Sequence, residues 1–279
     1  MFIIISMKTS KQHLARNKGH FHPLWSVHTG ESPVFATALH AGHQIRSELA
    51  AIMALEESAR LREEDPYTDV LSRVVPNRIV PIRSRFEVDL NRSRKEAIYL
   101  SPEDAWGLQV WKKQPTTQMI NKSLGEFDQF YSETKRVLKK LEIKYRRFVV
   151  FDIHSYNHRR GGPHAAPDSP SENPDINIGT GTMDRQKWAN VIDRFISDLK
   201  HYDYMEQHFD VRENVKFRGR EFATWVHQNF PDSGCVLSIE LKKNFMNEWT
   251  GKIDAKKLLG LYHALKSTLP GISHELQQL

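Results

Sequence analysis

The stretch FVVFDI at residues 148–153 decides the fold class that the sequence predicts. It is a short apolar run of β-branched and aromatic residues, which is typical of a strand buried on both faces. A charged amphipathic pattern at residues 126–145, just before it, predicts a long helix. Long helices that alternate with fully buried strands are typical of α/β proteins, so we expect an α/β fold.

The same alternation continues on both sides of this strand. Residues 34–39 and 234–241 are apolar runs that predict buried strands, and residues 85–90 alternate polar and apolar as a half-exposed strand does. Residues 44–62 carry apolar side chains at loosely helical spacing. The other predicted helices begin near Asp184, Glu221 and Ala255, and a polar tail follows the last of them.

A loop interrupts the pattern directly after the central strand. Residues 160–174, RGGPHAAPDSPSENP, contain four prolines and two glycines, which predicts a surface loop. Strong strand patterns lie on both sides of it, so the loop interrupts one domain and does not separate two. We therefore expect a single domain over residues 1–279, with an N-terminal extension at residues 1–30.

The composition is that of a globular protein. Hydrophobic residues make up 39% and charged residues 27%, which excludes a largely disordered chain. Cys235 is the only cysteine, so no intramolecular disulfide can form. No apolar run approaches the roughly 18–20 residues that span a bilayer. These features predict a soluble cytoplasmic protein.

The chain carries a formal charge of +6. Such an excess permits a nucleic acid, an anionic surface or an acidic small molecule as partner. The most basic stretch, KRVLKKLEIKYRR at residues 135–147, is more simply the solvated face of a predicted helix. We therefore expect no nucleic-acid or membrane partner, and nothing in the sequence indicates an oligomeric state.

Polar side chains of catalytic types follow four of the predicted strands. In open α/β sheets ligands bind outside the carboxyl ends of the strands, so these residues are candidates for one site. Histidines, an arginine and a carboxylate at such an edge suggest a metal hydrolase. The residues are His40 and His43 after strand 34–39, Asn91 and Arg92 after 85–90, His154 after 148–153, and Glu240 after 234–239.

His40 and His154 are the predicted metal ligands, because each is placed by a buried strand. Catalytic zinc takes three protein ligands and leaves a position for water. Asp152 lies two residues before His154, on the same strand face, where either it or a backbone carbonyl can hold the imidazole N–H and fix its tautomer. The third ligand stays open between the acidic cluster EEDPYTD at residues 63–69 and His43, three residues after His40.

Seven segments carry a resemblance to a known family: SPVFATALHAGHQI at 32–45, EEDPYTDVL at 63–71, SRFEVDLNR at 84–92, VFDIHSY at 150–156, INIGT at 176–180, NVKFRG at 214–219 and VLSIELKK at 236–243. In this order they resemble the N-formylglutamate amidohydrolase family. The wider resemblance is to zinc carboxypeptidases and aspartoacylase. It implies a three-layer α/β/α sandwich around a mixed, mostly parallel sheet of about eight strands, as in zinc exopeptidases.

The resemblance also implies an activity and a set of roles. The activity is a metal-dependent amidohydrolase that cleaves an N-formyl or other N-acyl group from an acidic amino acid such as glutamate. The expected partner is then a small anionic N-acyl amino acid, and the expected cofactor is one zinc ion per chain. The implied roles are His40, Asp65 and His154 as metal ligands, Glu240 as general base, Arg85 at the oxyanion, and Asn91 and Arg92 at the substrate carboxylate.

The chain departs from the related enzymes in two places. Carboxypeptidases use His-x-x-Glu for two ligands, whereas His43 takes the fourth position here, so the third ligand stays open among Asp65, His43, Glu64 and Asp69. The loop 160–174 follows the second histidine motif, where it can reshape or cover the pocket. The alternatives are a carboxypeptidase or an N-acyl amino acid deacylase with the same residues, and a basic nucleic-acid-binding protein.

Overall fold

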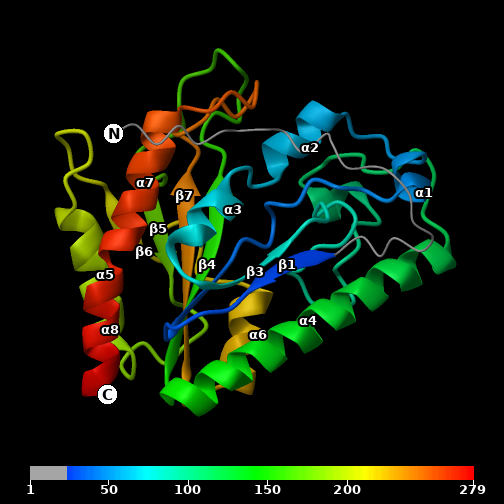
Figure 1. Cartoon of the computed structure of the whole chain (residues 1–279). Helices are drawn as coiled ribbons and strands as arrows, with labels where there is room; N and C mark the ends of the chain where they lie inside the picture. The colour runs from blue at the N-terminus through cyan, green and yellow to red at the C-terminus, as the bar shows by residue number, and fades with distance from the viewer. Residues whose placement is uncertain (1–23) are drawn as a thin grey trace, which may run out of the picture.

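The computed structural model describes residues 24–279, and a single sheet runs through it (Figure 1). Its strands are β1 (Trp25–His28), β2 (Val34–Thr37), β3 (Asn77–Pro81), β4 (Phe148–Tyr156), β5 (Ile176–Gly179), β6 (Val211–Glu213) and β7 (Gly234–Lys242). They lie in the order β1-β3-β2-β4-β7-β5-β6. β1 is antiparallel to β3 and β5 to β7, while the other neighbours are parallel. The expected mixed, mostly parallel sheet is confirmed, with seven strands in residues 24–279 where about eight were expected.

The two longest strands, β4 and β7, lie side by side at the centre. Every residue of β4 is buried, as its apolar sequence predicts. The parallel register runs from Phe148 opposite Gly234 to Tyr156 opposite Lys242. His154 and Glu240 therefore lie within paired strands and do not follow them. They are also direct partners in register.

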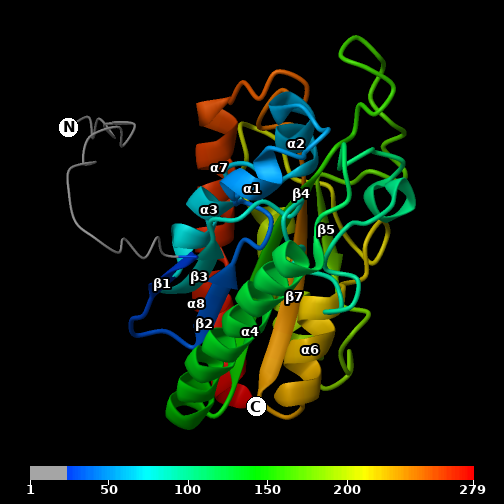
Figure 2. The ribbon, with the colours of Figure 1, turned by 90° about the vertical axis from the view of Figure 1, so that its right-hand side faces the viewer.

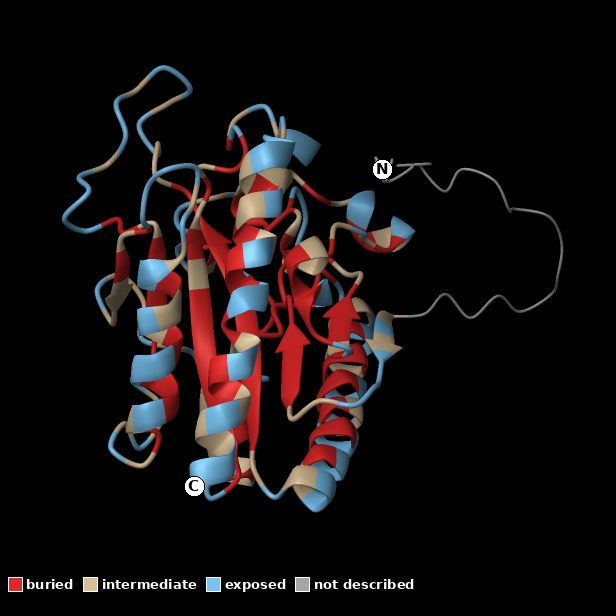
Figure 3. Ribbon diagram, turned by 60° about the vertical axis from the view of Figure 1, so that its left-hand side comes forward, coloured by how far each residue is buried: buried red, intermediate tan, exposed pale blue. Residues whose placement is uncertain are grey.

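Helices cover both faces of this sheet (Figures 1 and 2). Helices α4 (Thr117–Tyr145) and α6 (Glu221–Asn229) pack on one face, and α3 (Thr68–Leu71), α5 (Ala189–His201), α7 (Ala255–Ser267) and α8 (Leu269–Gln278) pack on the other. In β4, Val150 contacts the first layer and Phe151 the second, because successive side chains point to opposite faces. Figure 3 shows the strands buried and the helices exposed on their outward sides. The predicted α/β/α sandwich is confirmed.

Short helical segments complete the secondary structure, and they correct one prediction. The segments are α1 (Ser47–Ala50), α2 (Glu57–Glu63), and the 3-10 turns η1 (Ser72–Val74) and η2 (Pro102–Ala105). The continuous helix predicted at residues 44–62 is wrong, because the chain leaves the helical path between α1 and α2. There the backbone N–H of Ala54 donates to the carbonyl of Val110 at 2.8 Å.

The strand predicted at residues 85–90 is also wrong. The backbone N–H groups of Glu87 and Val88 both donate to the carbonyl of Ser84, at 3.0 and 3.3 Å, which makes this stretch a turn. The polar–apolar alternation has another cause. Val88 enters the core, while Glu87 and Asp89 are buried in polar networks and not solvated.

Two predictions in the C-terminal half need correction. Helix α5 begins at Ala189 and not at Asp184, whose Oδ1 accepts the backbone N–H of Gln186 and of Lys187 and closes a turn before the helix. The predicted polar tail is helix α8, and its Ile272 is buried in the core beside α5.

The predicted N-terminal extension, residues 1–30, includes a strand of the sheet. Residues 25–28 form β1, which pairs with β3 at the edge of the sheet, and residues 1–23 lie outside the described residues. Residues 160–174 contain no helix or strand. Between residues 24 and 279, no helix is both long and apolar enough to cross a membrane.

Candidate active site

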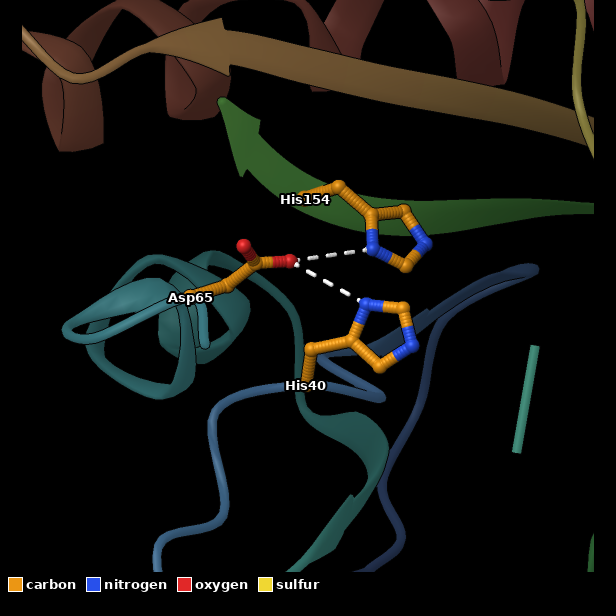
Figure 4. A group of neighbouring side chains, drawn as sticks. All are labelled: His40, Asp65 and His154. Carbon is orange, nitrogen blue, oxygen red and sulfur yellow. Dashed lines mark hydrogen bonds and ion pairs between the residues drawn. The ribbon is translucent and has the colours of Figure 1, made fainter. Parts of the chain in front are cut away.

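Two histidines and one aspartate meet at the carboxyl edge of the central strands (Figure 4). Oδ2 of Asp65 lies 3.2 Å from Nδ1 of His154 and 3.4 Å from Nδ1 of His40. One ligand atom from each side chain lies within 4.8 Å of the other two, and all three residues are buried. Imidazole and carboxylate groups are the donors of many catalytic zinc sites, so these three residues fit a zinc ion.

The sheet and one backbone hydrogen bond bring these residues together. β2 and β4 are parallel neighbours, so their carboxyl ends lie at the same edge. His154 lies in β4, and His40 follows the end of β2 by three residues. Asp65, between α2 and α3, is fixed to the first histidine because its N–H donates to the carbonyl of His40 at 2.9 Å.

The other candidates for the third ligand lie elsewhere. Nδ1 of His43 contacts one carboxylate oxygen of Glu64, and the other oxygen accepts the hydroxyl of Ser84. Asp69 is partly exposed and pairs with a neighbouring arginine at 3.6 Å. Among the described residues, the cavity beside the histidine pair is lined by none of these three candidates. The geometry therefore favours Asp65.

A second carboxylate holds the far nitrogen of each histidine. Nε2 of His154 is 2.9 Å from Oδ1 of Asp152, and Nε2 of His40 is 2.7 Å from Oδ1 of Asp89. Carboxylates in this position fix the orientation and tautomer of a ligand histidine. The sequence pattern indicated Asp152 but missed Asp89, because residues 85–90 were predicted to form a half-exposed strand.

These carboxylates also set the charge of the site. Burial disfavours the charged form of His154, but Asp152 and Asp65 outweigh it and raise the pKa of His154 well above its ordinary value. The pKa of Asp65 is lowered, since hydrogen bonds with His154 and His40 outweigh the cost of burial. The carboxylates of the site thus favour a positive charge between them. A bound metal cation can supply this charge in place of a proton on the histidine.

Asp89→Asn should weaken zinc binding about 10- to 100-fold, because an amide holds the His40 ring less firmly than a carboxylate does. Competition with a chromophoric chelator measures this affinity. Asp152→Asn should have an effect of similar size through His154. Asp69→Asn is the matched control and should bind zinc like the wild type. Unchanged affinity in Asp89→Asn would show that its carboxylate does not orient His40.

Arg85 reaches the cavity from the turn that follows Ser84. Its Nη2 donates to Oδ2 of Asp89 at 2.8 Å, its Nε donates to the hydroxyl of Tyr99 at 3.1 Å, and its guanidinium lies 4.8 Å from the centre of the Trp106 ring. Burial disfavours the charge, but Asp89 more than compensates and raises the pKa of Arg85 above its ordinary value. Arg85 is therefore a fixed cation beside the candidate metal ligands His40, Asp65 and His154.

The structure separates the two members of the Asn-Arg dipeptide. Asn91 lines the cavity, with its Nδ2 3.3 Å from Nε2 of His154. Arg92 does not line the cavity in the described residues. Its Nη2 donates to the carbonyl of Asp104 at 2.6 Å, and its guanidinium lies 4.6 Å from the centre of the Tyr99 ring.

Glu240 lines the cavity from β7, opposite His154 in the register of the sheet. Burial raises its pKa to about 7; Asp65 and Asp152 add to the rise, and the positive charges of His154 and Arg220 oppose it. A carboxylate with such a pKa can both accept and release a proton near neutral pH.

The cavity has a volume of about 90 Å³ and is rich in cationic side chains. Sequence reasoning found only one of them, Arg85. Arg220 directly follows the segment NVKFRG and Arg160 opens the proline-rich loop, so both lie beside recognised motifs, but only the folded loops show that they reach the cavity. The cationic side chains that line the cavity are Arg85, Arg160, Arg220 and Lys243.

Comparisons with known proteins show the family to which the chain belongs. The family match places the chain among hydrolases that act on amide C–N bonds. The sequence model of the N-formylglutamate amidohydrolase family matches residues 32–246, and the chain belongs to that family. The resemblance found in the seven segments is thus confirmed. No curated protein sequence matches the chain.

Two solved structures share the fold over most of the chain. An N-formylglutamate amidohydrolase from Ralstonia eutropha JMP134 superposes with a TM-score of 0.71 at 15% identity, covering 91% of this chain and 98% of that chain. A gene product of Agrobacterium tumefaciens superposes with a TM-score of 0.67 at 14% identity, covering 91% and 96%. At such identities the likeness shows the fold.

Proposed function

We propose that the chain hydrolyses the formyl amide of an N-formyl acidic amino acid, with N-formylglutamate as substrate and a zinc ion held by His40, Asp65 and His154. The observation that carries this proposal is the meeting of these three side chains with Glu240 and Arg85 in one cavity. Family membership supports both the amide bond and the formyl group. The cavity is small beside the roughly 300–1,000 Å³ of most ligand pockets, which favours a compact substrate over a peptide.

Glu240 is the general base of the proposed reaction. A zinc ion bound at the site would acidify a water molecule and polarise the carbonyl group. The Glu240 carboxylate removes a proton from the attacking water as the water oxygen bonds to the formyl carbon. It then delivers this proton to the amide nitrogen, and the bond between that nitrogen and the formyl carbon breaks. The products are formate and the free amino acid.

Arg85 stabilises the carbonyl oxygen as that oxygen gains negative charge. Asp89 and Tyr99 already fix the guanidinium, so it needs no rearrangement during the reaction. A fixed donor of this kind is typically worth about 2.7–4 kcal/mol. Asn91 lines the same cavity and contacts a polar group of the substrate. Cys235 is a buried free thiol, which fits our proposal that the enzyme works in the reducing cytoplasm.

The zinc-loaded protein should release formate from N-formylglutamate faster than it releases acetate from N-acetylglutamate. We expect a preference of about 10- to 200-fold, because one added carbon must fit a small cavity. Formate and free amine, assayed separately, measure the two rates. A peptide with a C-terminal glutamate should react more slowly still. Faster acetate release would favour a deacylase, faster peptide cleavage a carboxypeptidase, and no turnover of any substrate would contradict the proposal.

A further inference from the structure

The catalytic cavity contains two arginines that the proposed reaction does not use, Arg160 and Arg220. We propose that each binds one carboxylate of the substrate, so that together they select N-acyl amino acids with two carboxylates. The substrate class is then N-formylglutamate and its close dicarboxylate relatives. This inference rests on the proposed function, because it assigns the specificity of the same site.

Arg220 lines the cavity near Glu240. It directly precedes α6, whose first turn is fixed to the site because the N–H of Phe222 donates to Oδ1 of Asn91 at 3.2 Å. Across residues 24–279, its guanidinium forms no ion pair. Its positive charge acts on Glu240 and lowers the pKa of that carboxyl group, against the effect of burial. An arginine without a protein anion is available for a bidentate bond to a substrate carboxylate.

Arg160 forms only a weak ion pair with the protein. Its Nη1 lies 3.7 Å from Oε2 of Glu63, and half of its side chain is exposed. Glu63 has a nearer partner, since Nε of Arg62 donates to Oε1 at 3.1 Å. A substrate carboxylate can therefore bind Arg160 while Glu63 stays paired with Arg62.

The chain before Arg160 is anchored, although the loop has no regular structure. The buried carboxylate of Glu248 accepts the N–H of His158 at 2.9 Å and the N–H of Arg159 at 2.8 Å. Nε1 of Trp249 donates to the carbonyl of Arg159 at 3.0 Å. Arg160 thus enters the cavity from a fixed point of the backbone.

Asn157 indicates that this part of the cavity is built for a polar ligand. It lines the cavity and is 3% exposed, and its Oδ1 has no hydrogen-bond partner in the described part of the chain. Buried polar groups nearly always have a partner, so Oδ1 of Asn157 is a place for a hydrogen-bond donor of the ligand. As an acceptor it fits the amide N–H of the substrate and not a carboxylate. Arg92, in contrast, is bonded outside the cavity to the carbonyl of Asp104.

Kinetics with three substrates tests the proposal. N-Formylglutamine lacks the side-chain charge of N-formylglutamate, and N-formyl-4-aminobutyrate lacks the α-carboxylate. Arg220→Gln and Arg160→Gln should each raise KM for N-formylglutamate about 10- to 100-fold and leave kcat nearly unchanged. Each variant should match the wild type on the analogue that lacks the carboxylate its arginine binds. The two variants should therefore lose selectivity against different analogues. Each should no longer prefer N-formylglutamate to the analogue that lacks the carboxylate its arginine binds.

Neighbouring arginines provide matched controls. Arg218 and Arg159 carry the same charge but do not line the cavity, so Arg218→Gln and Arg159→Gln should keep the wild-type KM. Equal KM changes in all four variants would show a general charge effect and overturn the proposal. Unchanged KM in Arg220→Gln and Arg160→Gln would also overturn it.

Binding of the product separates this inference from the proposed function. Titration calorimetry with L-glutamate and with glutarate needs no turnover. One outcome is that the wild type hydrolyses none of the three substrates, while both arginine variants bind glutamate more weakly than the wild type does. The proposed reaction then fails and dicarboxylate binding stands. If hydrolysis occurs and glutamate binds the variants as it binds the wild type, the dicarboxylate proposal fails and the reaction stands.

Discussion

Glu240→Gln should lower kcat about 10²- to 10⁴-fold, while zinc content and KM stay close to those of the wild type. The amide is nearly the same size as the carboxylate but cannot take a proton from water. The base works only when ionised, so wild-type activity should fall as pH falls through the pKa of Glu240. Burial, with Asp65 and Asp152, raises that pKa to about 7, and a bound cation lowers it, which places the acid limb at or below neutral pH. Steady-state rates across this pH range should show the limb in the wild type and not in the variant.

Two measurements distinguish loss of the base from loss of structure. Glu63→Gln removes another carboxylate of the same cavity and should keep kcat within a few-fold of the wild type. The raised pKa of Glu240 means that its ionisation costs stability as pH rises from the ordinary 4.5 through about 7. The neutral amide avoids this cost, so metal-free Glu240→Gln should melt no lower than the wild type at alkaline pH. Unchanged kcat would remove Glu240 as the base.

The sequence predicted the fold best where side-chain pattern and burial have a single explanation. Residues 148–153 are apolar at nearly every position, and only a strand covered on both faces accommodates them, as β4 confirms. Residues 85–90 show the limit of the method. Their alternation fits a strand, yet the polar residues Glu87 and Asp89 are buried, because a turn brings them to partners distant in the sequence.

The candidate site was predictable where strands place its residues. His40 and His154 follow or lie in neighbouring parallel strands, so their meeting follows from the order of the sheet. Arg160 and Arg220 enter the cavity from loops, whose paths depend on tertiary hydrogen bonds that no local pattern records. Arg92 shows the reverse, because a recognised motif residue turns away to the backbone near η2.

His154→Ala should reduce zinc from about one ion per chain to almost none and should reduce formate release to background, because two ligands cannot hold a catalytic zinc ion firmly. Elemental analysis of the purified protein measures the metal. The substitution also leaves Asp65 and Asp152 without their shared partner, so the variant should be less stable as well. Asp65→Asn is the gentler second variant, since it keeps the shape of the side chain and removes only the charge. It should lose zinc too, at a smaller cost in melting temperature.

His43→Ala is the matched control for both ligand variants and decides the question that the sequence left open. His43 lies three residues after His40, where the sequence left it open as a third ligand, but its Nδ1 contacts Glu64 and its side chain is one-third exposed. It should keep a full complement of zinc and most of the activity. If it loses zinc while Asp65→Asn retains it, then His43 is the third ligand and the chain after β2 rearranges when the metal binds. If both keep zinc, the metal is held by a different set of residues from the one that meets at the carboxyl edge of β2 and β4.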